Sequence, residues 1–417
     1  KVEPWWGAGA AVKSDADGRW AVSVRTPAGS YEPQRITFAS GDRVTFDRVL
    51  IGEVWFAGGQ SNMEMPLGGF WQCPVTDANE IIARADAKSG KLHYVKIPHA
   101  AAYTPQDRTA GSWTPCTTAT AAKFTAAGYF FAEMLNDVLG VPVGIIDCSW
   151  GGSRVESWMS REVLSGYSDI DLTEEGISRV AQHLRPMVMY NAMLRPVAGY
   201  TVRGFLWYQG ESNVGRYMDY AARLADMVSL WRGLWAQDDL PFYYVEIAPF
   251  EYGNGKSPYL REAQCRAQEL IPNSGMICTN DLVEPYEFCN VHPKNKRDVG
   301  YRLAFMALNK TYGMKEIACQ SPQYESMEIR DGKARIRFKY MDQGFNRMAD
   351  IRGFEICGAD KVFYPADAVV ENQFALVVSS EKVPEPVAVR YCFRDFQPGN
   401  LADTRELPVV PFRTDDF

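Results

Sequence analysis

The pattern of hydrophobic positions changes twice along the chain, and its middle part alternates short apolar runs with longer segments of helical period. Five runs are typical of buried strands: EVWFAG (53–58), VGIIDCS (143–149), GFLWYQ (204–209), FYYVEIA (242–248) and GMICTND (275–281). Apolar residues at helical spacing predict three helices: Phe124, Phe131, Leu135 and Val138; Tyr220, Leu224, Met227, Trp231 and Leu234; Val299, Leu303 and Met306. Alternating strands and helices favour an α/β fold, with a mainly parallel sheet between two layers of helices.

The two ends of the chain show strand patterns without helices. DADGRWAVSV (15–24) predicts a turn and a strand, and RITFASGDRVTF (35–46) predicts a hairpin around Gly41. Near the other end, SMEIRDGKARIRF (326–338) carries an Asp-Gly turn between alternating runs, and further short strands follow it. We therefore expect N-terminal strands over residues 1–49, an α/β domain over 50–320 and a β-domain over 321–417. Because the N-terminal strands are few, we expect them to complete a sheet with the C-terminal ones.

Length and composition narrow the classes of function. A chain of 417 residues exceeds the usual size of one domain, and 46% hydrophobic with 23% charged residues is ordinary for a globular protein. The net charge is −7 and no run of Lys or Arg occurs, so we expect no nucleic-acid partner. No apolar stretch reaches about 18 residues, so no membrane span is expected. The nine cysteines have no CxxC pair or zinc spacing, and we expect no metal site.

Polar residues gather where the predicted strands end. Four segments follow strand runs: Gly58–Met63, Trp150–Ser153, Gln209–Asn213 and Asn290–Pro293. Because functional residues of an open parallel sheet collect at the carboxyl ends of its strands, these segments are expected to meet.

Ser61 and His292 are the candidate nucleophile and general base. A serine after two glycines at a strand end can expose its hydroxyl on a tight turn, and histidine titrates near neutral pH. Taken alone, Ser61 is more typical of a turn serine that caps the next helix, and a histidine before proline is more typical of a surface or capping position. Gly152 and Gln209 are candidate oxyanion donors. Taken alone, each is more often a tight turn or a polar strand end, and it is their joint occurrence at successive strand ends that favours the functional interpretation.

These segments together resemble the sialate O-acetylesterase family of the SGNH (GDSL-like) hydrolase superfamily. The blocks that carry the resemblance occur in the family's order: GEVWFAGGQSNMEMP, GIIDCSWGGSRVESW, FLWYQGESN and NVHPKNKRDVGYRL, followed by the ending VAVRYCF…LPVVPFRTDDF. The resemblance covers nearly the whole chain and implies an SGNH-like, flavodoxin-like catalytic domain over residues 50–320. It also implies Ser61 as nucleophile, His292 as base, and Ser61 N–H, Gly152 and Gln209 as the oxyanion hole.

The implied activity is hydrolysis of acetyl esters on sialic acids, without a metal or organic cofactor, by a secreted or periplasmic enzyme. Related enzymes act on acetylated plant polysaccharides, so an acetyl xylan or other polysaccharide acetylesterase is the alternative. A carbohydrate-binding protein with a decayed site is the third interpretation. The intact Ser61, Gly152, Gln209 and His292 argue against decay.

The group that orients His292 is left open by the sequence. The superfamily often has Asp three residues before the histidine, where this chain has Cys289. Asn290, Glu287, Asp281 or a backbone carbonyl are the other candidates. Glu211 and Asn213, in the third block, are candidate substrate-binding or orienting residues, and Glu211 is as readily explained as a loop anchor. The family usually has a longer N-terminal β-region, so we expect strands to be missing from that region here.

Overall fold

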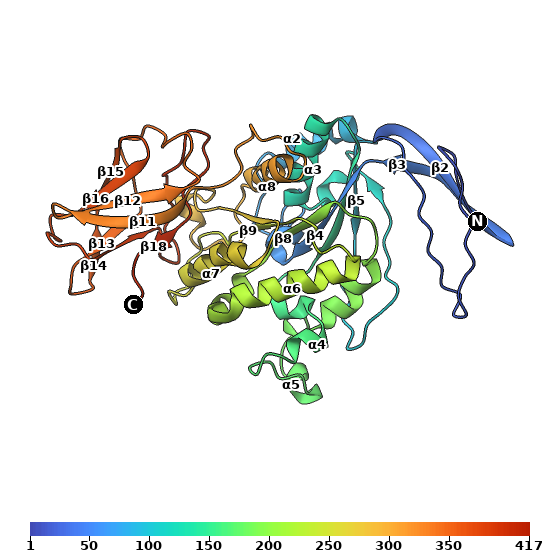
Figure 1. Cartoon of the computed structure of the whole chain (residues 1–417), viewed down its shortest axis with the longest axis horizontal. Coiled ribbons are helices and arrows are strands. Elements are labelled where there is room, and N and C mark those ends of the chain that lie inside the picture. The colour runs from blue at the N-terminus through green and yellow to red at the C-terminus, as the bar shows by residue number, and fades with distance from the viewer.

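The computed structural model describes all 417 residues, and a seven-stranded sheet lies at its centre (Figure 1). The strands follow the order β10-β9-β8-β4-β7-β5-β6. Their bounds are β4 (Glu53–Gly59), β5 (Leu92–Lys96), β6 (Thr114–Pro115), β7 (Val143–Ser149), β8 (Gly204–Tyr208), β9 (Phe242–Val245) and β10 (Ser274–Ile277). All neighbours are parallel except β5 and β6. Each of the five apolar runs therefore contains an expected strand, whereas β5 and β6 were not predicted.

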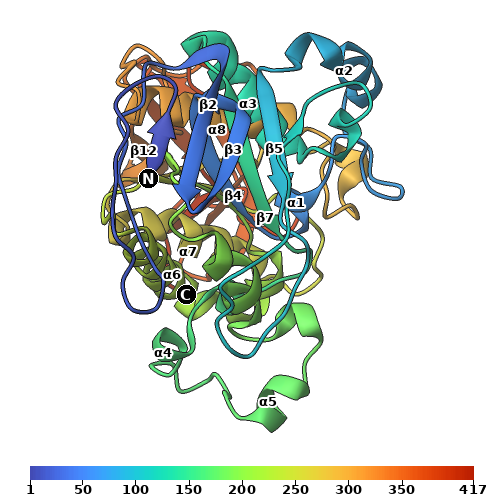
Figure 2. The same ribbon diagram turned by 90° about the vertical axis from the view of Figure 1, so that its right-hand side faces the viewer.

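The order of the strands decides which strand ends meet. β4 comes first in this sheet along the chain and lies between β7 and β8, and Figure 2 shows β4, β7 and β5 side by side. The second parallel strand, β5, lies outside the third, β7, which differs from the flavodoxin order, where the second strand adjoins the first. The chain reverses its direction of travel across the sheet at β4. This switch point brings the carboxyl ends of β4, β7 and β8 together.

Helices cover both faces of the sheet, as expected (Figure 1). α3 (Ala126–Leu139) and α8 (Arg297–Lys310) lie on one face, and α6 (Tyr220–Trp235) and α7 (Ser257–Leu270) lie on the other. Successive side chains of a strand point to opposite faces, so Trp55 packs with the first pair of helices and Phe56 with the second. The shorter helices are α1 (Ser61–Glu64), α2 (Ala78–Arg84), α4 (Arg161–Leu164) and α5 (Glu174–Ser178).

The three predicted helices are present, with two differences in detail. Phe124 precedes α3 instead of belonging to it, and Val138 is 42% exposed at the end of that helix. The spacing rule treats the segment as one uninterrupted helix, so it misjudges both ends of α3, although Phe124 is fully buried as expected. The predicted strand at residues 20–24 is also absent, although the turn before it forms.

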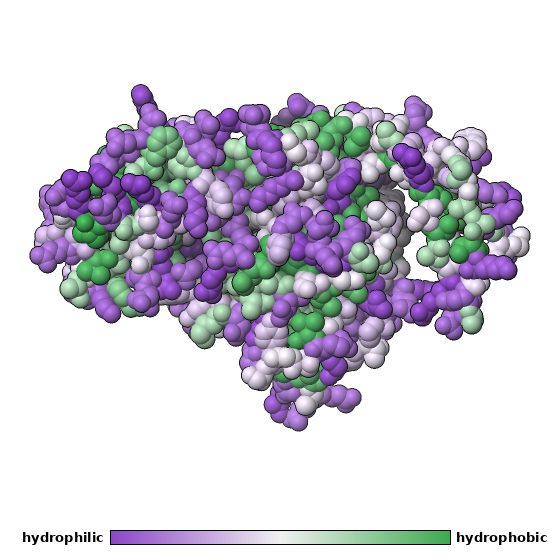
Figure 3. Space-filling model, viewed as in Figure 1, coloured by the Kyte–Doolittle hydropathy of each residue, from purple (hydrophilic) through white to green (hydrophobic).

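The N-terminal strands form a sheet of their own. β1 (Val2–Pro4), β2 (Ser30–Ser40) and β3 (Asp42–Ile51) pair only with one another, and they lie at the opposite end of the molecule from the C-terminal strands (Figure 1). The expectation that the two ends share a sheet is therefore wrong, because the α/β part separates them. Hydrophobic side chains lie on the surface of this sheet (Figure 3), and Phe46 is 56% exposed.

The C-terminal strands form two antiparallel sheets around a third hydrophobic cluster. One sheet contains β11 (Gln323–Arg330), β12 (Lys333–Lys339), β16 (Ala375–Ser379) and β15 (Asp367–Glu371). The other contains β14 (Phe363–Pro365), β13 (Phe354–Cys357), β17 (Ala388–Tyr391) and β18 (Phe412–Arg413). The hairpin expected at Asp331–Gly332 joins β11 to β12. The domain boundaries at residues 50 and 320 remain predictions.

Asp395 joins the C-terminal strands to the α/β part at the start of α7. Its carboxylate accepts hydrogen bonds from the backbone N–H groups of Asn254, Gly255 and Ser257, at 3.1, 2.8 and 3.2 Å. The Ser257 hydroxyl donates to it as well, at 2.7 Å. One turn further on, the buried guanidinium of Arg261 donates to backbone carbonyls of the C-terminal region.

Candidate active site

Ser61 is the first residue of α1, and one residue, Gln60, separates it from the end of β4. The turn needs glycine at position 59, whose φ is +139° and where a Cβ would lie 2.2 Å from the carbonyl oxygen of Tyr208. Because the backbone passes so close to β8, Ser61 emerges beside that strand's carboxyl end. The Ser61 side chain is half-buried, and its backbone N–H donates to no acceptor in the protein.

Asn62 connects the serine to the histidine loop. It is fully buried, and its amide nitrogen donates to the Glu211 carboxylate at 2.6 Å and to the Val291 carbonyl at 2.9 Å. Its amide oxygen accepts from Lys296 Nζ at 2.7 Å. Because Asn62 follows Ser61 and Val291 precedes His292, these bonds place the serine and histidine segments side by side.

His292 is contacted by residues of the loop after α1. Its Nδ1 lies 3.8 Å from Cys73 Sγ, and the Phe70 ring meets the imidazole edge-on with 5.3 Å between centroids. Its Nε2 is buried and makes no hydrogen bond. If the proton is on Nδ1, facing the sulfur, Nε2 is left as an acceptor, which is the tautomer a general base requires.

The candidate orienting groups hold the loop instead of the imidazole. Glu287 accepts from the backbone N–H groups of Glu284 and Lys294, both at 2.9 Å. Asp281 is paired with the Arg302 guanidinium at 2.6 Å. No carboxylate contacts His292 Nδ1, so the orientation of the ring depends on neutral neighbours.

Asn290 and Cys289 behave differently although they are adjacent. The Asn290 side chain accepts from the His292 N–H at 3.0 Å, donates to the His292 carbonyl at 2.9 Å and accepts from the Cys73 thiol at 3.3 Å. Cys289 is exposed, and the hydrogen bond partner of Nδ1 on the sulfur side is Cys73, not Cys289. Asn290 thus fixes the backbone of His292, while Cys289 does not replace the missing carboxylate.

Burial controls the charges around this site. Burial, assisted by the nearby positive charge of Lys296, lowers the pKa of His292 to about 4. Burial also lowers the pKa of Lys296 to about 7, against the opposing effect of Glu211. The pKa of Glu211 is raised, mainly by burial. His292 is therefore neutral at pH 7, in the form that can accept a proton.

The glycine turn after β7 lies against the serine helix. Glu64, three residues after Ser61, accepts a hydrogen bond from the Gly151 N–H at 2.7 Å. Gly152 has a φ of +73°, and the Ser212 hydroxyl donates to its carbonyl at 2.8 Å. The Gly152 N–H, like that of Ser61, donates to no protein acceptor. These two N–H groups, at the ends of neighbouring strands, are therefore free to donate to another oxygen, as the donors of an oxyanion hole must be.

Gln209 does not have the arrangement expected of an oxyanion donor. It is fully buried, and its amide hydrogens go to the Ser153 carbonyl at 3.0 Å and to Asn213 Oδ1 at 2.8 Å. The Tyr220 hydroxyl donates to its amide oxygen at 2.9 Å. As placed, this amide has no hydrogen left for a substrate oxygen. Through its bond to the Ser153 carbonyl, Gln209 instead holds the Gly152–Ser153 turn against the end of β8.

Asn213 and Glu211 are also internal connections. Asn213 accepts from the Val155 N–H at 3.1 Å and donates to Glu156 at 2.9 Å, and it is fully buried. These bonds support an orienting role for Asn213 over direct contact with a substrate. Glu211 accepts from Asn62 through one oxygen, while its other oxygen is buried without a partner. Of the two interpretations of Glu211, the hydrogen bond supports the loop anchor.

Several residues of the site carry no clear signal in the sequence. Asn62 and Lys296 lie inside the serine and histidine blocks, but 234 positions separate them. Glu64 lies in the first block and binds His99 Nε2 at 2.7 Å, and His99 stacks on Trp150 with 4.4 Å between centroids. His99 lies outside the four blocks. In the sequence, its only distinguishing feature is that histidine is a rare residue in this chain.

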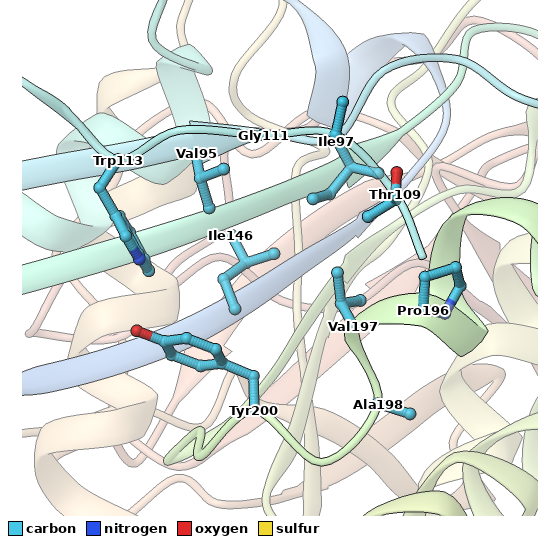
Figure 4. A pocket seen from close by; sticks show the side chains of 11 residues that line it. Val95, Ile97, Thr109, Gly111, Trp113, Ile146, Pro196, Val197, Ala198 and Tyr200 are labelled. Atoms are coloured by element: carbon cyan, nitrogen blue, oxygen red, sulfur yellow. The ribbon is translucent and has the colours of Figure 1, made fainter. Parts of the chain in front are cut away.

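An apolar recess lies apart from this site. It has a volume of about 310 Å³, and Figure 4 shows Val95, Ile146 and Val197 lining it, with Trp113 and Tyr200 on one side. None of the residues discussed above as site candidates lines it. No group of three or more His, Cys, Asp and Glu side chains is arranged to hold a metal ion. No helix is long and apolar enough to cross a membrane.

The fold and the blocks at the carboxyl edge of its sheet define an esterase of the SGNH class. Residues 51–309 match the model of a family described as carbohydrate esterase, sialic acid-specific acetylesterase, and the chain belongs to that family. A carbohydrate acetylesterase from Xanthomonas citri has a similar structure, with a TM-score of 0.89 and 34% identity, covering 100% of this chain and 92% of that one.

Curated mammalian proteins are more distant in sequence. The sialate O-acetylesterase of Mus musculus is 26% identical over 401 residues, covering 83% of this chain and 73% of the mouse protein. That of Pongo abelii is 28% identical over 373 residues, covering 83% of this chain and 70% of the other.

Proposed function

We propose that this chain is a carbohydrate O-acetylesterase that works through an acetyl-Ser61 intermediate, with His292 as general base. The observation that carries the proposal is the Asn62 side chain, which binds the Val291 carbonyl and so joins the serine segment to the histidine segment. The neutral imidazole has its Nε2 buried and without a hydrogen bond. No hydrogen bond joins Ser61 Oγ to Nε2 in this conformation, and such bonds often tighten only when substrate binds.

The reaction proceeds in two steps. Ser61 Oγ attacks the acetyl carbonyl carbon while His292 Nε2 takes the hydroxyl proton, and a tetrahedral oxyanion forms. The Ser61 and Gly152 N–H groups stabilise that oxygen. The C–O bond to the sugar then breaks, and the sugar oxygen leaves with the proton from Nε2. Water then attacks acetyl-Ser61 while Nε2 takes its proton. As acetate leaves, the bond between Ser61 Oγ and the acetyl carbon breaks, and Nε2 returns the proton to Oγ.

For the substrate, we propose acetylated sialic acids first, because the family and the mammalian relatives are described by that activity. Acetylated xylan or another polysaccharide is the alternative substrate. Release of acetate from matched panels of O-acetylated sialosides and xylo-oligosaccharides distinguishes the two. Activity on neither panel contradicts both.

The mechanism is tested by Ser61→Ala. We expect hydrolysis of a chromogenic acetyl ester to be lost while the free energy of unfolding changes by no more than about 1 kcal/mol, because this half-buried hydroxyl makes no hydrogen bond in the protein. Mass spectrometry of the acid-quenched wild type should find the acetyl group on the peptide containing Ser61. A variant that keeps most of its activity would refute the assignment.

We also propose that the protein works outside the cytoplasm, in the periplasm or after secretion. The proposal rests on the resemblance alone, since all nine cysteines are free and no disulfide supports it. Fractionation of the native cells followed by immunodetection tests it, and a protein found only in the cytoplasmic fraction contradicts it.

A further inference from the structure

The loop between α1 and α2 contains a tight hairpin that contacts His292. Phe70 and Cys73 exchange two backbone hydrogen bonds, with N to O distances of 2.9 and 3.0 Å. Both residues that flank the turn reach the imidazole, Phe70 through its ring and Cys73 through its sulfur. The corner residues are Trp71 and Gln72, and Gln72 adopts a left-handed φ of 60°. This geometry holds the turn against the proposed base.

Trp71 is exposed to solvent at this corner. Its side chain is 89% exposed, and it makes no hydrogen bond, aromatic contact or cation–π contact. Its Cα lies about 3.8 Å from that of Phe70, so the indole starts beside a residue that touches His292. Trp71 therefore presents a solvent-exposed aromatic face on the hairpin whose flanking residues contact His292.

Other exposed tryptophans differ from Trp71 in their contacts. The Arg35 guanidinium lies over the Trp5 ring at 4.6 Å, and Trp20 packs near Phe38 with 6.1 Å between centroids. Both belong to the N-terminal region, at one end of the molecule (Figure 1). Isolated exposed hydrophobic residues are common on proteins. What sets Trp71 apart is the combination of near-complete exposure with attachment to the hairpin that contacts the base.

We propose that Trp71 is a specificity-determining residue that stacks on a sugar ring of the substrate and holds the glycan beside Ser61 and His292. The inference rests on the proposed function. An indole offers a large, rigid apolar face, and a pyranose ring offers a face of C–H groups that packs against it with little loss of side-chain freedom. The occupant is therefore an acetylated sugar with at least one ring reaching beyond the acetyl group, and a small aryl acetate would not need this face.

The test compares two substrates in three variants. For Trp71→Ala, the ratio of kcat/KM on an acetylated oligosaccharide to kcat/KM on a small aryl acetate should fall about tenfold, mainly through KM. Trp71→Phe should recover most of the ratio because it keeps an aromatic face. Trp5→Ala is the matched control, an exposed tryptophan removed from the N-terminal region, and should leave the ratio unchanged.

Each outcome decides the proposal. An unchanged ratio in Trp71→Ala overturns it, and equal losses on both substrates overturn it too, because they would mean that the hairpin only positions His292. Failure of the proposed function looks different, since Ser61→Ala would then keep its activity. If Ser61→Ala is inactive and the Trp71→Ala ratio is unchanged, the esterase mechanism stands and the sugar-stacking role is wrong.

Discussion

The serine side and the histidine side of the proposed site are built in different ways. Asn62, next to the serine, is fully buried and hydrogen-bonded to a carboxylate, an ammonium group and a backbone carbonyl. On the histidine side, the imidazole itself lies against a thiol at 3.8 Å and one aromatic edge, and the Asn290 amide binds its backbone. A nucleophile must be placed rigidly against the oxyanion donors, and the sheet provides that rigidity. The base is held by loops, so changes there should affect rate more than stability.

The largest effect should come from removing the base. We expect His292→Ala to lower kcat/KM on a chromogenic acetyl ester by about 10²–10⁴-fold, because general base catalysis is lost. Stability should change little, since Nε2 makes no hydrogen bond in the protein. Steady-state kinetics and urea unfolding of the same preparation measure both. An activity loss of less than tenfold would mean that another group accepts the serine proton.

A matched pair of asparagines tests the comparison directly. Asn62→Ala leaves Glu211 and Lys296 without their buried partner, and each such group costs about 1–3 kcal/mol. Asn290→Ala removes bonds in a partly exposed loop and should cost about 1 kcal/mol or less, with a clear loss in kcat. Urea denaturation gives the two free energies of unfolding. Equal destabilisation by both changes would break the distinction between the two sides.

The acidity of His292 predicts an unusual pH profile. With its pKa lowered to about 4 by burial, the imidazole stays neutral as the pH falls through 6.5, where an ordinary histidine becomes protonated. At pH 5.5 an ordinary histidine is only about one-tenth neutral, so kcat/KM would have fallen about tenfold. We expect instead a value within about twofold of that at pH 7. Rates at constant ionic strength, corrected for spontaneous hydrolysis, test this, and an acid limb near pH 6.5 contradicts it.

The smallest effects should come from two cysteines of the histidine side. Cys73→Ala removes the sulfur near Nδ1 and should lower kcat about two- to fivefold, equivalent to roughly 0.5–1 kcal/mol. Cys289→Ala should leave kcat unchanged, because that thiol is exposed and away from the ring. Parallel kinetics of the two variants provide the measurement. A larger loss for Cys289 than for Cys73 would reverse our account of the loop.

The sequence predicted the positions of the blocks better than the directions of their side chains. Continuous apolar runs such as VGIIDCS mark strands buried on both faces, and β7 has the predicted bounds. β5 was missed because LHYVK mixes polar and apolar residues. Gln209 was correctly placed at a strand end, but whether its amide points to the site or inward depends on Asn213 and Ser153.

The hydrophobic pattern could not predict contacts between segments that are far apart in the sequence. The bond from Lys296 to Asn62 depends on which strands are neighbours, and the order of the strands is not written in their hydrophobic pattern. The misplaced N-terminal sheet has the same cause. The hydrophobic pattern predicts that a segment is a strand, but it does not predict which other strand it pairs with. Here the α/β part lies between the N-terminal and C-terminal strands, so these cannot pair.

The bonds from Asp395 to the start of α7 have a consequence for how the molecule unfolds. If the C-terminal region detached alone, three N–H groups at the start of α7 and the buried charge of Arg261 would lose their partners. That penalty couples the two parts, so melting in a calorimeter should follow one cooperative transition instead of two. For the same reason, shortening the chain to its α/β part should yield an aggregation-prone fragment rather than a smaller esterase.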